Sequence, residues 1–479
     1  MRQGMDSHRA HFAPAPASVL DSVSHTWRAL RHRNFKLFFF GQSISVIGTW
    51  MTRLATAWLV WQLTHSALLL GVGSFSGQIV SFLMGPFAGV WVERMERRRL
   101  LVITQAGGAI QSLALAALTL THVITLGEII GLMAFQGLIN AFDMPGRQSF
   151  LIQMVEDRGD LANAIAINSS MANGARLIGP AIGGIIIAAF GEGWCFLIDG
   201  VSYFAVIASL LLMHIPALKG RDGIESSLLV ELREGWDYVR GFRPIRTILL
   251  LFALTCLMGW PYSVLLPVFA GKVLHGGAHT LGWLTAASGV GAFSSALALA
   301  MRKSVVGLTR TLQAAAVLLG AGLILFGLSH ILWLSLVLMV VVGFGLIQAA
   351  AVSNTIIQSL VPDDKRARVM GYYTMAFFGA APFGSLMAGA LAQHIGAPDT
   401  VMLTGAFCIA GAVWFTLQLP KIRPEMRATY REKELSAARA AAAEEALAAA
   451  RQASASIAKP KTSSATPHQR LMSMPRERR

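Results

Sequence analysis

Apolar segments of about 20 residues alternate with short polar segments from residue 38 to residue 419. A helix of about 20 apolar residues spans the ~30 Å hydrocarbon core of a bilayer. The pattern therefore predicts an all-α membrane protein with twelve transmembrane helices, at 38–61, 68–91, 100–121, 125–144, 163–190, 194–213, 247–270, 279–300, 311–329, 331–354, 370–392 and 399–419.

The polar segments divide the chain into five parts. We expect a cytoplasmic N-terminal segment, a six-helix bundle, a linker, a second six-helix bundle and a cytoplasmic tail, at 1–36, 37–213, 214–246, 247–420 and 421–479. In the linker, Leu228, Leu232, Trp236 and Val239 recur at helical spacing among charged residues, which predicts a helix lying on the membrane surface. The tail is expected to be helical over 428–452 and disordered beyond it.

Basic residues predict how the chain is oriented. The even-numbered connections between predicted spans carry 18 Lys and Arg, whereas the odd-numbered connections carry only Lys272. Because Lys and Arg are retained on the cytoplasmic side, both termini are expected in the cytoplasm of a bacterium, with the chain in its inner membrane. The first 36 residues lack the apolar core of a cleavable signal, so the first span is expected to be permanent.

Composition narrows the range of functions. The chain is 54% hydrophobic and has a net charge of +15, but 13 of its 40 Lys and Arg follow Pro420 and most others lie in short loops. This distribution indicates membrane topology, so no nucleic-acid partner is expected. The three cysteines show no metal-ligand spacing, and no nucleophile with its base is visible. We therefore expect neither an enzyme, nor a metal site, nor a cofactor.

An internal repeat indicates how the two bundles are related. Residues 152–191 align with 357–396 at a shift of 205 without a gap, and the same shift aligns Arg97 and Arg98 with Arg302 and Lys303. The matching pairs are Ile152/Ile357, Gln153/Gln358, Ala162/Ala367, Gly174/Gly379, Ala175/Ala380, Gly179/Gly384, Gly184/Gly389 and Gly191/Gly396. Two parallel repeats predict a pseudo-twofold axis along the membrane normal, with a ligand site between the halves.

The connection after the second span carries a family signature. Its sequence, Gly89-Val90-Trp91-Val92-Glu93-Arg94-Met95-Glu96-Arg97-Arg98, resembles the G-x-x-x-D-R-x-G-R-R motif of the major facilitator superfamily, with Glu for Asp and Glu96 for Gly. The resemblance implies that Glu93 docks on the N-terminal end of the eleventh helix, near Met370, and that Arg97 pairs with Asp143. The cytoplasmic gate would then comprise Gly89, Glu93, Arg94, Arg97, Arg98 and Asp143. The alternative, that these charges only set topology, remains open.

Other segments resemble exporters of this superfamily. Gly179-Pro180-x-x-Gly183-Gly184 in the fifth span is similar to an exporter motif, although close helix packing explains its glycines equally well. The segments 48–52, 63–66, 143–148 and 199–203 resemble the branch that contains the enterobactin exporter and related secretion transporters. This resemblance implies export of small molecules without identifying one.

Three ionisable residues are predicted inside the membrane, where each costs on the order of 2.5–3.5 kcal/mol to insert. Arg53 and Asp199 are expected at similar depths, about 22 Å and about 21 Å from the cytoplasmic edge, which predicts a pair that is structural or releases on proton binding. Arg176 is expected about a helix width from the cytoplasmic face, and it needs an acid or a polar cavity. These three residues are the candidates for proton coupling or for intramembrane charges with a structural role.

The central cavity of the major facilitator fold is lined by the first, fourth, seventh and tenth helices. The resemblance therefore implies the following substrate-cavity residues: Gln42, Ser45, Thr49, Arg53, Phe135, Gln136, Asn140, Trp260, Tyr262 and Gln348. Aromatic rings mixed with amides suit an amphipathic organic molecule better than an inorganic ion.

We therefore expect a monomeric secondary transporter that exports a siderophore, drug or metabolite by alternating access, with protons as the coupling ion. No G-x-x-x-x-G-K-[ST] loop is present, so ATP is not expected to be the direct fuel. Proton- or ion-coupled uptake by the same fold remains open, as does a membrane scaffold or receptor that transports nothing.

Overall fold

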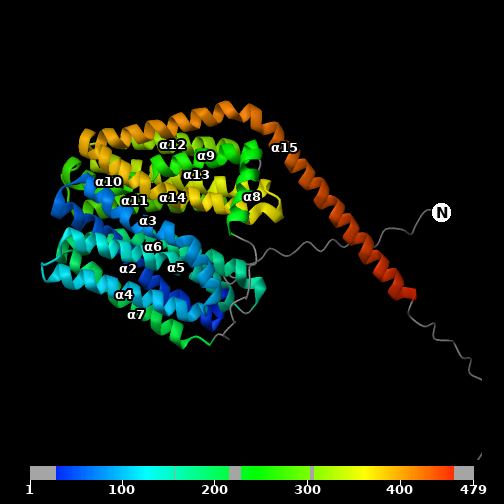
Figure 1. The fold of residues 1–479 in the computed structure, drawn as a ribbon, viewed down its shortest axis with the longest axis horizontal. Coiled ribbons are helices and arrows are strands. Elements are labelled where there is room, and N and C mark those ends of the chain that lie inside the picture. Colours follow the sequence, from blue (N-terminus) through cyan, green and yellow to red (C-terminus); the bar gives the residue numbers. More distant parts are fainter. Residues whose placement is uncertain (1–27, 156, 215–227, 303–306, 458–479) are drawn as a thin grey trace, which may run out of the picture. The chain divides into compact units, whose positions relative to one another are not determined.

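The computed structural model describes residues 28–155, 157–214, 228–302 and 307–457, and all regular structure in these ranges is helical (Figure 1). The chain divides into two compact units, Met1–Pro420 and Lys421–Arg479. The first unit contains a helical bundle, and the described residues of the second unit continue α15 (Ala397–Ile457).

The first half of the bundle contains six long helices. They are α2 (Arg33–Thr64), α3 (Ala67–Arg94), α4 (Arg97–Leu120), α5 (Leu126–Met154), α6 (Leu161–Phe190) and α7 (Glu192–Leu212), with short turns η1 (Arg28–Arg31) and η2 (Arg158–Asp160). Local chemistry fixes the ends of these helices. The Ser66 hydroxyl accepts a hydrogen bond from Leu69 N at the start of α3, and Glu128 accepts one from Thr125 N at the start of α5.

The second half follows α8 (Leu228–Gly241), which corresponds to the helix predicted in the linker. Its elements are α9 (Arg243–Gly259), α10 (Tyr262–Val268), η3 (Phe269–Val273), α11 (Ala278–Ala300), α12 (Leu308–Leu328), α13 (Leu332–Leu360), α14 (Asp363–Ile395) and α15. The single seventh span predicted from sequence is interrupted at Trp260 and Pro261. Pro261 has no N–H for a helical hydrogen bond, so the helix breaks there.

Ten described helical segments are long and apolar enough to cross a membrane, with α9, α10 and η3 counting as one segment. Two further long helices, α2 and α5, have 32 and 29 residues but are not among the ten. They carry the polar side chains that the sequence predicts on the first and fourth spans, which lowers their mean hydropathy. Together these helices are consistent with the twelve predicted spans.

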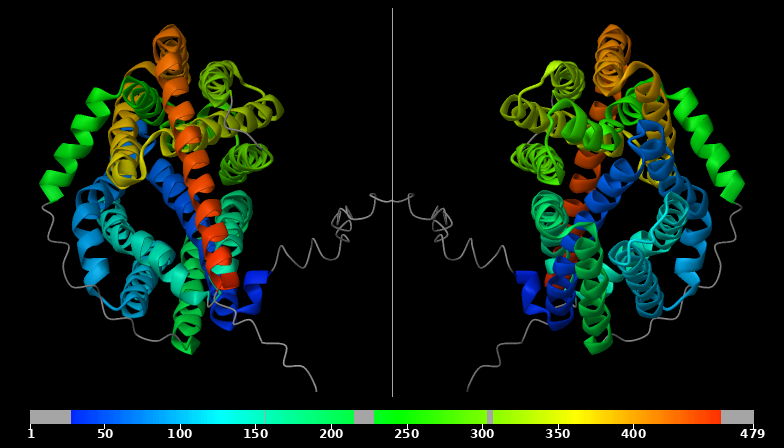
Figure 2. Two further views of the ribbon diagram at one scale, coloured as in Figure 1. Left: turned by 90° about the vertical axis from the view of Figure 1, so that its right-hand side faces the viewer. Right: turned by 90° about the vertical axis from the view of Figure 1, so that its left-hand side faces the viewer.

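The internal repeat is also a structural repeat. Gly191, between α6 and α7, has φ +90°, and Gly396, between α14 and α15, has φ +88°. Only glycine adopts this region readily, so both halves use the same residue to restart a helix at the same place. Seen along the helices, the two halves form separate groups (Figure 2). The prediction of an all-helical fold with two related halves is confirmed, and the count of six helices in each half stays a prediction with which these helices are consistent.

Two helix pairs form most of the contact between the halves: α3 packs against α14, and α6 packs against α11. Smaller contacts join α10 to α2 and α3, and α11 to α2. The surface helix α8 lies at one end of the bundle, where Glu234 forms an ion pair of 2.9 Å with Arg368 near the start of α14 (Figure 1). We call this the α8 end and the other the opposite end. Burial, together with the nearby Asp364 carboxylate, raises the pKa of Tyr238 on α8 above its ordinary value.

Candidate functional site

The halves are in backbone contact at the opposite end. A Cβ placed at Gly184 of α6 would lie 3.0 Å from Gly282 Cα of α11, and a Cβ at Gly389 of α14 would lie 2.9 Å from Gly71 Cα of α3. Gly184 and Gly389 are equivalent in the repeat. Since Cβ atoms essentially never approach so closely, glycine at these positions allows the opposite end to close.

Polar contacts extend this closure along α3 and α14. Ser66 Oγ lies 3.2 Å from Gln393 Oε1, and deeper in the bundle Ser74 Oγ lies 3.3 Å from Ser385 Oγ. Between α3 and α14, the last close glycine contact toward the α8 end is at Gly379. A Cβ placed there would lie 2.9 Å from the ring of Phe82 on α3. The interface thus runs from the opposite end to about mid-depth.

Toward the α8 end, glycines on the same helices have no close neighbour. A Cβ added to Gly85 or Gly89 on α3, to Gly174 on α6, or to Gly371 on α14 would meet nothing within 4 Å. These positions lie on the same helices that are in contact at the opposite end. The close glycine contacts of the opposite end are thus not repeated at these positions, and we refer to the space between the halves on this side as the cavity.

Two arginines and two tryptophans meet at the inner end of this cavity. The guanidinium carbon of Arg53 lies 4.9 Å from the ring centroid of Trp50, and that of Arg176 lies 5.7 Å from the same centroid. Arg176 also lies 5.7 Å from the ring centroid of Trp260, which belongs to the second half. We call Trp50, Arg53, Arg176 and Trp260 the arginine–tryptophan site. It spans the boundary between the two halves.

Aromatic packing and the break in the seventh span hold Trp260 in place. Its ring centroid lies 5.3 Å from that of Phe377 on α14 in an edge-on arrangement, and Phe377 also stacks on Phe252. Pro261, which follows directly, packs against α14, because a Cβ at Gly384 would stand 2.8 Å from its ring. The second half therefore presents Trp260 on a rigid aromatic support.

The two arginines have no acidic partner within ion-pair distance. Within the described part of the chain, no carboxylate oxygen lies within 4.0 Å of either guanidinium group. The Arg53 side chain is exposed and Arg176 is half-buried. Arg176 lies at the level of Arg53, deeper than the sequence predicts. A charge that is exposed yet far from both bundle ends is expected in a water-filled cavity.

Asp199 lies near this site, with its carboxylate placed between α4 and α2. Its Oδ2 accepts a hydrogen bond of 2.8 Å from Ser112 on α4, and its Oδ1 is buried without a hydrogen-bond partner. A Cβ at Gly48 of α2 would stand 2.7 Å from that Oδ1. The direct Arg53–Asp199 pair that the sequence predicts is absent from this conformation, because Arg53 turns toward Trp50.

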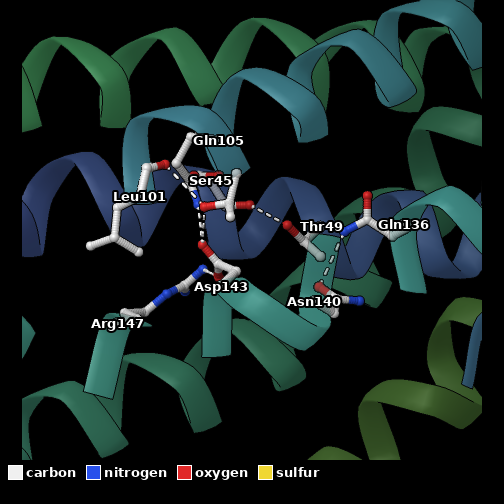
Figure 3. A network of polar contacts seen from close by, with 9 residues as sticks. Ser45, Thr49, Leu101, Gln105, Gln136, Asn140, Asp143 and Arg147 are labelled. Carbon is white, nitrogen blue, oxygen red and sulfur yellow. Dashed lines mark hydrogen bonds and ion pairs between the residues drawn. The ribbon is translucent and has the colours of Figure 1, made fainter. Parts of the chain in front are cut away.

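A second polar network surrounds Asp143 on α5 (Figure 3). Its Oδ1 accepts hydrogen bonds from Thr104 Oγ1 at 2.9 Å and Gln105 Nε2 at 2.7 Å, and Arg147 pairs with its Oδ2. The sequence predicts Arg97 as the partner, and this is corrected here to Arg147. Arg147 lies one turn along the same helix, and this i, i+4 spacing is the signal that the prediction overlooked.

The other predicted cavity residues fall into two groups. Thr49 on α2 and the Gln136–Asn140 pair on α5 are half-buried at facing helices, and in Figure 3 the amide pair lies next to Thr49. Phe135 is exposed. In contrast, four are buried: Gln42, Ser45, Tyr262 and Gln348.

Contacts with α11 explain two of the buried residues. The Tyr262 hydroxyl lies 2.5 Å from Ser288 Oγ, and Gln348 Oε1 accepts a hydrogen bond of 2.7 Å from Ser295. Both side chains therefore join helices within the second half in this conformation, and neither reaches the arginine–tryptophan site.

The predicted latch is only partly described. The side chains of Glu93 and Arg94 lie outside the described residues, whereas the backbone there belongs to α3. Arg97 begins α4, and Arg98 donates a hydrogen bond of 2.7 Å to the Leu211 carbonyl at the end of α7. That carbonyl has no partner within its own helix, so Arg98 caps α7.

The helix-five motif has two structural roles. Gly179 and Gly183 face α2: a Cβ at Gly179 would stand 2.6 Å from Trp50 Cβ, and one at Gly183 would stand 3.2 Å from Met51 Cα. Gly184 faces α11 at the closed end, and Pro180 is buried inside α6. The motif thus lets α6 approach both halves and places Trp50 near Arg176.

Comparison with known proteins identifies the family. Residues 24–444 match the transmembrane secretion effector family of the major facilitator superfamily. The chain belongs to this family. Its members are membrane transporters, which agrees with a cavity between two related bundles.

Relatives cover almost the whole bundle. The chain is 25% identical to the staphyloferrin A transporter of Staphylococcus aureus, over 81% of this chain and 98% of that protein. It is 27% identical to the multidrug efflux pump Tap of Mycolicibacterium fortuitum, over 81% and 96%. It is 21% identical to macrolide efflux protein A of Streptococcus pyogenes, over 80% and 96%.

Solved structures share the fold. The nucleoside transporter NupG matches with a TM-score of 0.63 at 15% identity, over 81% of this chain and 99% of that one. A bacterial homologue of the lysosomal transporter Spinster, solved in an inward-facing conformation, matches with a TM-score of 0.63 at 14% identity, over 84% and 98%. At these identities the likeness supports the major facilitator fold alone.

Proposed function

We propose that this chain exports a small organic molecule across the bacterial inner membrane by alternating access, in exchange for protons. The single observation that carries the proposal is the cavity between the halves, open at the α8 end and closed by glycine contacts such as Gly184 with Gly282 at the other. The basic loops favour a cytoplasmic α8 end with both termini on that side. One chain contains the whole pathway, so we propose a monomer.

The direction is supported by the relatives. Two of them are efflux proteins for drugs or macrolides, and a third transports the siderophore staphyloferrin A. A cavity open to the cytoplasm is the state in which an exporter loads its substrate. Glu93 would then dock at the start of α14 when this end closes, as the signature motif implies.

Asp199 is the proposed proton carrier. It is a buried acid near the arginine–tryptophan site, and its Oδ1 has no hydrogen-bond partner. A carboxylic acid at this place can bind and release one proton, which changes the charge between α2 and α7. Such a group in the middle of a bundle couples protonation to the packing of α2 against α7.

The charges of the cavity favour one second candidate, proton-coupled uptake. A proton on Asp199 makes the surroundings of Arg53 more positive. If the substrate is an anion, proton and substrate therefore favour each other's binding, as symport requires. Antiport requires the opposite, that proton binding and substrate binding weaken each other. Both candidates use the same cavity. They differ in whether proton and substrate strengthen or weaken each other's binding, and in the direction in which the substrate crosses the membrane.

Transport by inverted membrane vesicles tests the proposal. Vesicles with an acidic lumen are expected to accumulate staphyloferrin A or a macrolide when they contain this protein, and to lose that accumulation when the proton gradient is collapsed. Vesicles carrying an empty vector provide the baseline. Accumulation only in right-side-out vesicles would establish uptake, and no movement of any compound in either preparation would refute transport.

A further inference from the structure

We propose that the arginine–tryptophan site binds an organic anion, with a carboxylate or similar group on the two arginines and an aromatic or apolar body between the two tryptophans. The inference rests on the proposed function only in taking this cavity as the transport pathway. It concerns what the cavity binds and not the direction of transport, although an anionic substrate with Asp199 as the proton carrier would favour the uptake candidate.

The first argument is charge. Arg53 and Arg176 lie over the same ring of Trp50, and no carboxylate in the described part of the chain approaches either within 4.0 Å. Asp199 offsets one charge at most, since its carboxylate is directed to Ser112 and Gly48. The cavity therefore holds at least one uncompensated positive charge at a depth where charge is costly. A bound anion removes that cost when the cavity closes.

The second argument is geometry. Guanidinium groups bind carboxylates through two parallel hydrogen bonds, and tryptophan faces provide an apolar surface for a ring. Trp50 comes from the first half and Trp260 from the second, and Arg176 lies over both. A ligand held by these four residues would contact both halves at once. Binding would therefore draw the halves together, as alternating access requires.

The second half supplies no competing acid at this depth. In its predicted spans at 247–270, 279–300, 311–329, 331–354 and 370–392 the sequence contains no Asp or Glu, and Asp399 is the first residue of the span at 399–419. In the first half Asp143 is already paired with Arg147. A cationic substrate would therefore meet two arginines with little to attract it.

Binding to the full chain in nanodiscs tests the inference with matched probes. We expect 1-naphthoate to bind measurably by calorimetry and 1-naphthylmethylammonium to bind at least about 10-fold more weakly. Arg53→Gln and Arg176→Gln should each weaken naphthoate binding roughly 10- to 100-fold, the range for loss of a charged hydrogen bond. Arg53→Lys should restore part of the affinity. Arg310→Gln, which removes an exposed arginine at the α8 end of α12, is the matched control and should bind as the unaltered chain does.

Equal binding of the two probes, or no binding of naphthoate, would overturn the inference. So would an Arg53→Gln variant that melts at a lower temperature but binds naphthoate normally, because the arginines would then be structural partners of Trp50. Measuring substrate flux in addition to naphthoate binding distinguishes failure of this inference from failure of the proposed function. Naphthoate binding with the expected pattern, in a protein that moves neither staphyloferrin A nor a macrolide in the vesicle assay, supports the anion site and counts against transport. Transport of a macrolide without recognition of naphthoate supports transport and refutes the anion site.

Discussion

Gly179 of α6 lies directly behind Trp50 of α2, where a Cβ would stand 2.6 Å from Trp50 Cβ and 2.9 Å from the Ile47 carbonyl oxygen. Arg176 lies one turn earlier on α6, with its guanidinium over the Trp50 ring. Gly179, together with Gly183 one turn further on, therefore allows the close approach of α2 and α6, and Gly179 is the one next to the arginine–tryptophan site.

The first prediction concerns this glycine. Gly179→Ala should force α2 and α6 apart, because the added Cβ meets backbone as well as side chain. We expect a loss of stability of about 1–3 kcal/mol, typical of overpacking, together with weaker naphthoate binding. The measurements are thermal unfolding in nanodiscs and calorimetry.

Gly174→Ala provides the matched control on the same helix. Its Cβ would meet nothing within 4 Å, and alanine has the higher helix propensity, so stability should be unchanged or slightly higher. If the two variants behaved alike, the close approach at Gly179 would not determine the site.

The second prediction concerns Asp143 and its partner. Arg147→Gln should leave a buried carboxylate with only Thr104 and Gln105, and should cost about 2 kcal/mol or more, less than the ~3–5 kcal/mol of a fully buried pair. Arg97→Gln should change stability by no more than about 0.5 kcal/mol. Thermal unfolding distinguishes the two, and a larger effect at Arg97 would restore the pairing predicted from the sequence.

The third prediction concerns Asp199. Asp199→Asn can still accept the hydrogen bond from Ser112 but cannot bind a proton. We expect proteoliposomes with this variant to retain exchange of labelled for unlabelled substrate and to lose accumulation driven by a proton gradient. Accumulation at the normal level would remove Asp199 from coupling.

Asp199→Asn also shows whether proton binding strengthens or weakens substrate binding. Because asparagine imitates the protonated acid, tighter substrate binding by Asp199→Asn indicates that proton and substrate travel together, as in uptake. Weaker binding indicates that they exclude each other, as in antiport. Calorimetry on both proteins at one pH provides the comparison.

Much of the fold could be predicted from the sequence because it depends on length and repetition. Apolar runs give the spans, and the 205-residue shift predicts that Gly191 and Gly396 are equivalent, as their matching positive φ angles confirm. The helix α8 also follows from the spacing of apolar residues in the linker.

The site was less predictable because it depends on how each helix is rotated. Neighbouring helix positions differ by about 100° around the axis, so a correct span still leaves the facing side open. Tyr262 and Gln348 therefore turn toward α11 rather than to the arginine–tryptophan site. Arg147 stands four residues after Asp143, a spacing visible in the sequence, whereas the resemblance to the signature motif implies Arg97.

The role of Trp50 depends on tertiary packing. A tryptophan next to polar residues in a span is ordinary core, and sequence separates it by 126 positions from Arg176 and 210 from Trp260. Only the packing of α2 against α6 at Gly179, and the break before Pro261, bring these side chains together. Cation–π contacts between distant spans leave no pattern in one sequence.

The most direct test of alternating access is a pair of spin-label distances in a background with Cys195, Cys256 and Cys408 replaced. One pair, Gly85→Cys with Gly371→Cys, spans the halves near the α8 end, and the other, His122→Cys with His330→Cys, spans them at the opposite end. Between alkaline and acidic pH we predict that the first distance shortens while the second lengthens. Two distances that stay constant, or that change in the same direction, would contradict the account.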